Sequence, residues 1–467
     1  MGRLVVVSNR VPALDREAAA GGLAVGVSAA LESTGGLWFG WSGVAAAEPA
    51  ADVSIHETGA FTLVTFDLSE SDYEGFYEGL ANRALWPLFH NRLDLTAFNA
   101  EDYAAYRRVN RLFAEKLRPL LVPGDVIWIH DYHLFLLGDE LRKMGVAAPL
   151  GFFLHIPFPP PEVFLALPWH REVTEALSAC DLLGFQTLRD ARNFVHFAAE
   201  EAGAEPLADG RLRVRDHILK VGAYPIGIDV EDFAGKVASP RHGRLIKRLT
   251  QRLGERTWIV GVDRLDYTKG ISQRFRAFEM FLERDSAHRG RVSFLQIAAP
   301  SREGVPEYVE MRSELETIAG RINGRHTELT WIPLIYINKS FGHERLAALY
   351  RLSRVGFVTP LRDGMNMVAK EYVAAQDGED PGVLVLSRFS GAAEEMDGAV
   401  IVNPYDVDGM AEALRMAVEM PLDERIARWS QSMDKLRKNT IHDWGKRFIK
   451  DLRAVETPEQ ASAAAGD

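Results

Sequence analysis

Residues 354–375 read RVGFVTPLRDGMNMVAKEYVAA: an apolar run of strand type, a turn, and a helix that we expect to begin near Met367. The same order of short β-branched or aromatic run, turn and helical pattern recurs along the chain. This order is typical of parallel α/β units and disfavours an all-α or all-β fold. The predicted strands lie at 3–9, 125–131, 150–156, 182–187, 257–263, 293–299, 354–360, 382–387 and 399–404.

The length of the chain predicts two domains, because 467 residues, 47% of them hydrophobic, exceed what one compact core usually organises. Residues 221–233, VGAYPIGIDVEDF, interrupt the pattern before a charged helix at 241–253, so we place the boundary near residue 226. The predicted parts are an N-terminal domain at 1–225, a second domain at 226–440, a terminal helix at 441–453 and a disordered tail at 454–467.

Composition disfavours several classes of protein. The chain has 54 Lys and Arg against 65 Asp and Glu, and its net charge of −11 has the wrong sign for binding nucleic acid. No apolar run approaches the roughly 20 residues of a membrane helix, and MGRLVVVSNR enters a strand directly, so we expect a cytoplasmic protein with no membrane partner. Cys180 is the only cysteine, which excludes an internal disulfide and predicts a small buried side chain.

Polar side chains follow many of the predicted strands, at the edge of a parallel sheet where ligands bind. Taken singly, Asp131 could be a helix cap, His155 a core histidine and Arg264 half of a surface ion pair. Together these residues predict a cleft lined by cations and a few carboxylates, as a phosphorylated or sugar-like substrate requires. They are Arg10, Asp131 and His155 in the first domain, and Arg264, Lys269, Arg302 and Asp363 in the second.

The turn at 359–366 has the properties of a site for a nucleotide sugar. Asn366 is a good N-cap, so the helix after it would point free N–H groups and a positive dipole end at a diphosphate. Arg264 and Lys269 would neutralise the phosphate oxygens. Asp363 and Glu371 could accept hydrogen bonds from sugar and ribose hydroxyls. The alternative for both carboxylates is compensation of the helix dipole.

Several weaker signals leave alternatives open. The segment AAGGLAVG at 19–26 is a glycine-rich loop that enters a helix, but it does not match G-x-G-x-x-G, so a dinucleotide oxidoreductase is disfavoured. Asp406 and Asp408 form a D-x-D pair, for which helix capping is favoured over metal binding. Three aromatic residues expected in loops or at helix starts would serve either sugar stacking or core packing: Trp41, Tyr77 and Trp86.

From about Leu4 to Leu452 the chain resembles the trehalose-6-phosphate synthases, retaining GT-B glycosyltransferases of family 20. The strings that carry the resemblance are RLVVVSNR, GGLWFGWSG, WIHDYHL, GFFLHIPFP, DLLGFQT, YPIGI, DRLDYTKG, AGRINGR, TPLRDGMN and VAKEYVAAQ. The resemblance implies two Rossmann-like domains with parallel sheets facing across a cleft. It further implies acceptor binding by the first domain, nucleotide binding by the second, and a terminal helix that crosses back to the N-terminal domain.

The resemblance also implies a role for each matching residue. The catalytic set is Arg264, Lys269, His155, Asp131 and Asp363. The donor would contact Gly22, Arg264, Lys269, His155, Asp363, Gly364, Met365, Asn366, Met367, Val368 and Glu371. The acceptor, glucose 6-phosphate, would contact Arg10, Trp41, Tyr77, Trp86, Asp131 and Arg302.

The implied reaction makes α,α-trehalose 6-phosphate from glucose 6-phosphate and UDP-glucose or GDP-glucose, with no cofactor and no essential metal. The loop INKSFGHERL carries Gly342 and His343 where bacterial members of the family have Asp and Arg, which makes GDP-glucose a contender as donor. Three alternatives are a family-20 enzyme with another phosphorylated acceptor, a non-catalytic sensor of sugar phosphates, and a nucleotide-binding α/β protein of another reaction class. A homo-oligomer is neither indicated nor excluded.

Overall fold

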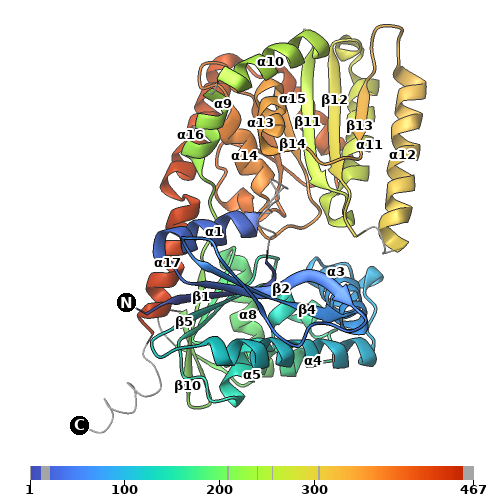
Figure 1. The fold of residues 1–467 in the computed structure, drawn as a ribbon. Coiled ribbons are helices and arrows are strands. Elements are labelled where there is room, and N and C mark those ends of the chain that lie inside the picture. The colour runs from blue at the N-terminus through green and yellow to red at the C-terminus, as the bar shows by residue number, and fades with distance from the viewer. Residues whose placement is uncertain are drawn as a thin grey trace. The chain divides into compact units, whose positions relative to one another are not determined.

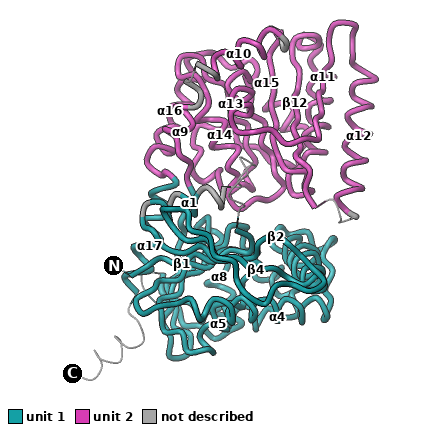
Figure 2. The backbone as a smooth tube through the Cα atoms, viewed as in Figure 1, with its two compact units in different colours: residues 1–16, 20–226, 441–467 teal, residues 17–19, 227–440 magenta. Residues whose placement is uncertain are grey.

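The computed structural model describes residues 2–11, 22–207, 210–238, 240–254, 256–302 and 306–455 (Figure 1). The chain divides into two compact units (Figure 2). Unit 1 combines the residues up to 226, except 17–19, with those from 441 onward, and unit 2 covers 227–440 together with 17–19. The loop at 12–21 and most of the predicted tail, 456–467, lie outside the described residues.

Unit 1 contains a ten-stranded sheet in the order β3-β4-β2-β1-β5-β6-β7-β10-β9-β8. The strands from β4 to β10 in this order pair in parallel, whereas β3, β9 and β8 add antiparallel edges. The bounds are β1 (Leu4–Arg10), β2 (Leu37–Ala46), β3 (Ser54–Glu57), β4 (Thr62–Ser69), β5 (Val126–His130), β6 (Leu150–Phe153), β7 (Leu182–Phe185), β8 (Glu205–Pro206), β9 (Arg211–Val214) and β10 (His217–Ala223).

The central strands of this sheet are short apolar runs that are buried along their whole length, as expected where helices cover both faces of a parallel sheet. The helices of unit 1 are α1 (Gly22–Thr34), α2 (Glu70–Asp72), the π-helix η1 (Tyr73–Leu85), α3 (Trp86–Phe89), α4 (Ala100–Leu117), α5 (Leu137–Lys143), α6 (Pro161–Phe164), α7 (His170–Ser178), α8 (Leu188–Glu201) and α17 (Ile441–Arg453).

Strand β1 is the point where the strand order of unit 1 reverses, because β2 pairs on one side of it and β5 on the other. In doubly wound sheets, ligands bind beyond the carboxyl ends of the strands at such a point. Strand β1 ends at Arg10, and Asp131 follows β5 directly. Two of the predicted acceptor residues therefore lie at the position that this topology favours for a ligand.

The last helix, α17, packs its aromatic side chains onto the sheet of unit 1. The rings of Trp444 and Phe448 lie 4.9 and 4.7 Å from the ring of Trp128 on β5. Space for Phe448 comes from Gly151 and Gly184, where a Cβ would lie 2.8 and 2.6 Å from its ring. An ion pair between Lys220 Nζ and Asp451 Oδ2, 2.8 Å, adds to this contact.

Unit 2 contains a six-stranded parallel sheet in the order β13-β12-β11-β14-β15-β16, the strand order of a dinucleotide-binding fold. The strands are β11 (Thr257–Arg264), β12 (Val292–Ala299), β13 (Leu334–Ile337), β14 (Val355–Val358), β15 (Val383–Ser387) and β16 (Val400–Val402). The helices are α9 (Val230–Ala238), α10 (Pro240–Leu253), α11 (Ile271–Arg284), α12 (Pro306–His326), α13 (His343–Leu352), α14 (Met367–Ala375), α15 (Val407–Glu419) and α16 (Leu422–Lys438).

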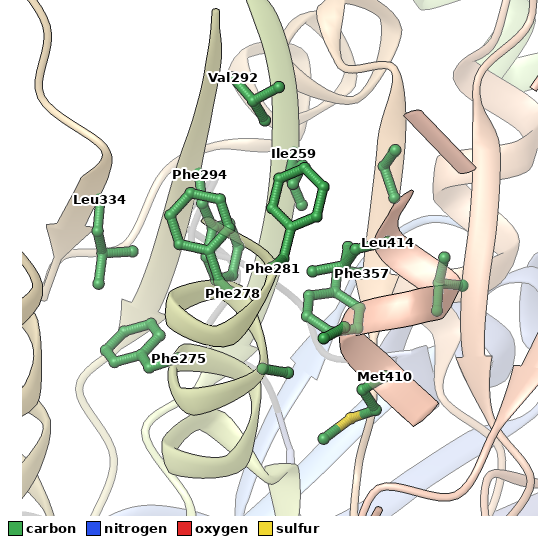
Figure 3. Packing of buried hydrophobic residues seen from close by; sticks show 14 of the residues in the cluster. Ile259, Phe275, Phe278, Phe281, Val292, Phe294, Leu334, Phe357, Met410 and Leu414 are labelled. Carbon is green, nitrogen blue, oxygen red and sulfur yellow. The ribbon is translucent and has the colours of Figure 1, made fainter. Parts of the chain in front are cut away.

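The core of unit 2 lies between this sheet and helices α11, α12 and α15 (Figure 3). The face of α11 that carries Phe275, Phe278 and Phe281 packs onto Phe294 of β12 and its neighbours. These phenylalanines follow the i, i+3 spacing that places side chains on one face of a helix. The core thereby fixes where β11 ends and α11 begins.

Every strand predicted from the sequence is present, as β1, β5, β6, β7, β11, β12, β14, β15 or β16, and the helices predicted at 241–253 and 441–453 are α10 and α17. The sequence patterns did not identify β2, β3, β4, β8, β9, β10 or β13. Three of these, β3, β8 and β9, are the antiparallel edge strands of unit 1. Within the described part of the chain, no helix is long and apolar enough to cross a membrane.

A glycine-to-alanine pair tests the packing of α17. We expect Gly184→Ala to lower the free energy of unfolding by about 1–3 kcal/mol, because the new Cβ overpacks the rings of Phe448 and Phe153. The matched control is Gly320→Ala in the middle of α12, where a Cβ meets no described atom within 4 Å, and it should stabilise by about 0.5–1 kcal/mol. Thermal and urea unfolding measure both. Equal effects would contradict close packing at Gly184.

Candidate functional site

The first cluster of predicted site residues lies in unit 2, at the carboxyl end of β11. Strand β11 ends at Arg264, whose side chain is exposed, and the short 3₁₀ turn η6 (Tyr267–Lys269) follows. Lys269 is largely buried, and its Nζ lies 2.5 Å from Asp363 Oδ2. An ammonium has three N–H donors, so this pair leaves two further donors for a ligand.

A buried arginine, Arg274, supports the turn that carries Lys269. Its side chain is 0% exposed and donates to the carbonyl oxygen of Lys269 at 3.1 Å. It also donates to Asp263 Oδ2 at 2.6 Å, Gln296 Oε1 at 2.8 Å and Thr359 Oγ1 at 3.1 Å. These partners belong to β11, to β12 and to the loop after β14, so one guanidinium links three neighbouring segments of unit 2.

The start of α14 is a capped helix N-terminus, a type of position that can bind an anion. Asn366 is the N-cap, as the sequence predicted, and its Oδ1 accepts a hydrogen bond from the N–H of Ala369 at 3.2 Å. Asn366 Nδ2 donates to Asp363 Oδ2 at 3.1 Å. No acidic side chain lies in the first turn of α14, which the structure describes throughout, so compensation of the helix dipole does not account for Glu371.

Neighbouring residues of α14 have different surroundings. Glu371 is half-buried and accepts a hydrogen bond from Tyr350 Oη of α13 at 3.4 Å. The side chain of Lys370 is fully buried and pairs with Glu395 at 2.5 Å. Consecutive helix residues point about 100° apart, so Lys370 serves the interior while Glu371 can meet a ligand. Lys370 was not singled out in the sequence, where it reads as an ordinary helix residue.

Asp266 is a further charged residue that sequence reasoning missed. It is 0% exposed, and its Oδ2 lies 3.3 Å from Arg302 Nη1 and 3.0 Å from Tyr308 Oη. Burial by itself raises the pKa of Asp266, but the positive charges of Arg302 and Lys269 outweigh this effect and lower the pKa to about 2. The available signal was its place directly after a strand, within DRLDYTKG.

The second cluster lies in unit 1, where Arg10 ends β1. The Arg10 guanidinium lies 5.8 Å from the ring centre of Trp41, within the range of a cation–π contact. Gly43 makes room for it, because a Cβ there would lie 2.5 Å from Arg10 Nε. Trp41 was expected in a loop or at a helix start, but it lies in strand β2. The prediction failed because β2 is a strand through its pairing with β1 and β4, which the sequence pattern did not reveal.

The other two predicted aromatic residues lie on helices with different exposure. Tyr77 lies inside the π-helix η1, where its ring stacks on His133 with centroids 5.7 Å apart and lies 5.9 Å from Trp41. Trp86 opens α3, as expected for a helix start, and is buried 4.2 Å from His90 and 5.8 Å from Tyr132. Core packing therefore accounts for most of the surface of Trp86, whereas Tyr77 is half-buried.

Asp131 links the ends of two neighbouring strands in unit 1. Its N–H donates to Phe153 O at 2.8 Å, and its Oδ1 accepts from the N–H of His155 at 3.3 Å. The alternative of a helix cap is wrong, since the side chain makes no capping bond to the described turn that follows. The backbone of Asp131, at φ 74° and ψ 165°, lies in a region that is unfavourable for any residue with a Cβ.

His155 is held in an uncharged state within unit 1. Its Nε2 lies 3.0 Å from His130 Nδ1, and its Nδ1 lies 3.5 Å from Gln186 Nε2. Burial lowers the pKa of His155 to about 3 and that of His130 well below its ordinary value. A neutral imidazole can exchange hydrogen bonds with a sugar hydroxyl, but it carries no charge for a phosphate near neutral pH.

Several predicted site residues have a strained backbone with positive φ. Among the described residues, five that are not glycine have positive φ, and three of these are Asp131, Arg302 and Asn366. Such conformations cost about 1–3 kcal/mol each and persist where the surroundings enforce them. They mark these positions independently of any sequence motif.

Other predicted features have structural roles. Asp406 caps α15 and accepts from the N–H of Gly409 at 2.9 Å, and Asp408 pairs with Arg284, so capping is confirmed for the first residue of the D-x-D pair. Cys180 is buried, and burial raises its pKa to about 12. In the described chain, two groups have the spacing of a metal site: Glu279, Glu283 and His326; and Asp285, His288 and Glu419. Neither group includes a predicted site residue.

The predicted site residues divide between the two units, and short contacts join some of them: Arg10 with Trp41, Trp41 with Tyr77, Asp131 with His155, and Lys269 with Asp363. Unit 1 holds Arg10, Trp41, Tyr77, Trp86, Asp131 and His155, together with Gly22 at the start of α1. Unit 2 holds Arg264, Lys269, Arg302, Asp363, Gly364, Met365, Asn366, Met367, Val368 and Glu371.

Two compact α/β units, each built on a mainly parallel sheet, are the architecture of the two-domain glycosyltransferases. Residues 4–454 match glycosyltransferase family 20, and the chain belongs to that family.

Characterised relatives match over almost their whole length. A trehalose-6-phosphate synthase from Sinorhizobium fredii is 48% identical over 97% of this chain and 99% of its own. A solved α,α-trehalose-phosphate synthase (UDP-forming) from Burkholderia xenovorans, in complex with glucose-6-phosphate, is 50% identical with a TM-score of 0.93 and covers 97% of this chain and 100% of its own. A solved chain from E. coli, bound with UDP-2-fluoro glucose, is 46% identical with a TM-score of 0.93 over 97% and 99%.

Two substitutions at Asn366 separate its two tasks. Asn366→Ala loses the cap and places a Cβ at positive φ, so we expect it to lower the free energy of unfolding by about 2–3 kcal/mol. Asn366→Gly keeps the backbone conformation at little cost and should lose less than about 1 kcal/mol. Urea denaturation compares the two. Equal losses would contradict the role of the left-handed backbone.

Proposed function

We propose that this chain is a trehalose-6-phosphate synthase, which transfers glucose from a nucleoside diphosphate to glucose 6-phosphate and makes α,α-trehalose 6-phosphate with retained configuration. The observation that carries the proposal is the match to family 20 over residues 4–454, with relatives of that name at 48% identity over nearly the full chain. The donor and acceptor residues carried over from the family pattern are present at their positions, apart from the departures at Gly342 and His343.

Unit 2 supplies the donor site in this proposal. The N–H groups at the start of α14 and the side chains of Arg264 and Lys269 bind the diphosphate, since helix ends and cations both attract phosphate oxygens. The carboxylate of Glu371, placed by Tyr350, accepts the ribose hydroxyls. These groups stabilise the charge that grows on the departing phosphate.

The acceptor, glucose 6-phosphate, is recognised through its phosphate and its ring. Arg10 and Arg302 neutralise the phosphate, Tyr77 offers aromatic surface to the sugar, and Asp131 accepts from its hydroxyls. The buried ring of Trp41 supports the Arg10 guanidinium. The stacking of Tyr77 on His133 and the space that Gly43 leaves for Arg10 hold these groups in place before any ligand binds.

The surroundings of Asp363 favour a front-face displacement over a covalent route. A covalent route needs a free carboxylate nucleophile, as in retaining glycosidases. The Oδ2 atom of Asp363 pairs with Lys269 at 2.5 Å and accepts from Asn366 at 3.1 Å, which spreads its charge and lowers its nucleophilicity. The departing phosphate instead takes the proton of the acceptor hydroxyl, while Asp363 and His155 hold the transferred glucose.

The choice of donor base is assigned to the start of α13. Gly342 is the N-cap of that helix, and among described atoms none lies within 4 Å of a Cβ built there. The missing side chain leaves room, and the imidazole of His343 offers different hydrogen bonds from an arginine fork. One unmet buried hydrogen bond costs about 1–3 kcal/mol, so a preference of roughly 5- to 150-fold between UDP-glucose and GDP-glucose follows.

The decisive experiment is an assay of purified protein with glucose 6-phosphate and each donor in parallel, with the product identified. We expect trehalose 6-phosphate and equimolar nucleoside diphosphate, unequal kcat/KM for the two donors, and full activity with a chelator present, because cations of the chain already face the phosphates. Ligand binding without a disaccharide phosphate would support a sensor instead. Activity abolished by chelation and restored by metal would contradict metal independence.

Single substitutions separate the two substrates. Arg10→Ala and Arg302→Ala should each raise KM for glucose 6-phosphate by roughly 10- to 150-fold, the value of one or two charge-assisted hydrogen bonds. Glu371→Gln should raise KM mainly for the donor. The control is Arg111→Ala, which removes an exposed arginine of α4 and should change neither constant. The reverse pattern would mean that the roles of the residues are exchanged.

A further inference from the structure

The carboxylate of Asp266 contacts both the turn that carries Lys269 and the side chain of Arg302. The proposed reaction gives Lys269 to the donor and Arg302 to the acceptor. Its Oδ1 accepts from the N–H of Thr268 at 2.9 Å and from Thr268 Oγ1 at 2.8 Å, which closes the turn that ends at Lys269. Its Oδ2 faces Arg302 Nη1 at 3.3 Å. The buried carboxylate of Asp266 therefore contacts two groups. One is the turn that carries Lys269, a proposed donor-binding residue, and the other is Arg302, a proposed acceptor-binding residue.

The neighbouring strands explain why these groups meet. Strands β11 and β12 pair in parallel up to Arg264 and Ala299, and the N–H of Leu265 donates to Ala299 O at 2.7 Å. The loops after both strands therefore leave the sheet side by side. Asp266 comes from the first loop and Arg302 from the second.

Tyr308, at the start of α12, completes the support of Arg302. It is buried, and its hydroxyl donates to Asp266 Oδ2 at 3.0 Å while accepting from Arg302 Nη1. Burial raises the pKa of Tyr308, and the Asp266 charge raises it further, so the phenol keeps the proton that it donates. Arg302 itself has φ 49°, a conformation that needs outside support.

We infer that Asp266 is a positioning residue of the transfer reaction, which holds Arg302 ready for the phosphate of the acceptor while it shapes the turn that presents Lys269. The inference rests on the proposed function. Asp266 touches no substrate in this account and acts through Arg302. It remains ionised wherever the enzyme works, because its pKa is about 2.

Two opposite effects of removing the Asp266 charge have to be weighed. By Coulomb's law alone, fewer negative charges would strengthen phosphate binding. However, the Arg302 side chain is only 8% exposed, and a buried cation that loses its partner is strongly destabilised in place. The guanidinium would then leave its position. We expect the affinity lost through this displacement to exceed the affinity gained by removing a negative charge.

Asp266→Asn is the direct test. The amide oxygen can still accept from Thr268, while an uncharged NH2 group replaces the Oδ2 atom that accepts from Arg302 and Tyr308. Calorimetry with glucose 6-phosphate should show Kd raised by about 10- to 100-fold, while Kd for UDP changes by less than about 3-fold. In the double variant with Arg302→Ala, affinity for glucose 6-phosphate should equal that of Arg302→Ala alone, because the two residues act in series.

Two further variants separate positioning from general damage. Asp125→Asn removes another buried carboxylate that pairs with an arginine, Arg3 at 2.8 Å, at the amino end of β5, and it should lower stability but leave both affinities within about 3-fold. Tyr308→Phe removes one hydroxyl from the Arg302 support and should weaken glucose 6-phosphate selectively by about 3- to 10-fold. If Asp266→Asn does not fold, the selective loss in Tyr308→Phe is the test of the inference.

Equal weakening of both ligands, unchanged affinity, or tighter binding of glucose 6-phosphate by the Asp266 variant would overturn the inference. A multiplicative loss in the double variant would also overturn it. Failure of the proposed function has a different signature, since it would show in the wild-type protein, which would then form no trehalose 6-phosphate.

Discussion

The buried ion pair between Arg274 and Asp263 is the constraint on which the turn carrying Lys269 depends, because Arg274 also donates to the carbonyl oxygen of Lys269. Burying a guanidinium is costly unless every donor finds a partner in good geometry. Arg274 places four of its five N–H donors on Asp263, Gln296, Thr359 and the carbonyl oxygen of Lys269, which belong to β11, β12, the loop after β14 and the turn η6. The same guanidinium therefore depends on the register of β11 and β12 and on the position of the turn at Lys269.

The residues of unit 1 that we propose bind the acceptor are held mainly by aromatic packing. Trp41 and Tyr77 belong to a packed aromatic group, and Arg10 fits beside it because Gly43 lacks a side chain. Aromatic packing tolerates a range of ring angles, whereas the charged network of unit 2 has discrete partners. In the proposed function, this difference suits a sugar ring that stacks on aromatic side chains and a diphosphate whose oxygens are bound individually. Strained backbone at Asp131 and Asn366 marks the strand end and the helix start involved.

Local patterns predicted most of the central sheet and one feature of the site in detail. Short apolar runs identified β1, β5 and β11 because buried parallel strands have a composition that few other elements share. The cap at Asn366 was readable because capping depends on residues within one turn. Trp41 was placed wrongly, since its strand, β2, is recognised by its pairing with β1 and β4 and not by its own sequence pattern.

The sequence by itself determined the α/β class, the main strands, the capped helix after TPLRDG and, through its resemblance to family 20, the substrates to test. Only the tertiary structure showed that Asp266, Tyr308 and Arg302 form one group, and that Lys370 points into the core while Glu371 does not. The physical reason is the range of the interactions. Propensities and caps act over a few residues, whereas the partner of a buried charge can lie 36 residues away, as Arg302 does from Asp266, and only folding decides which charges meet.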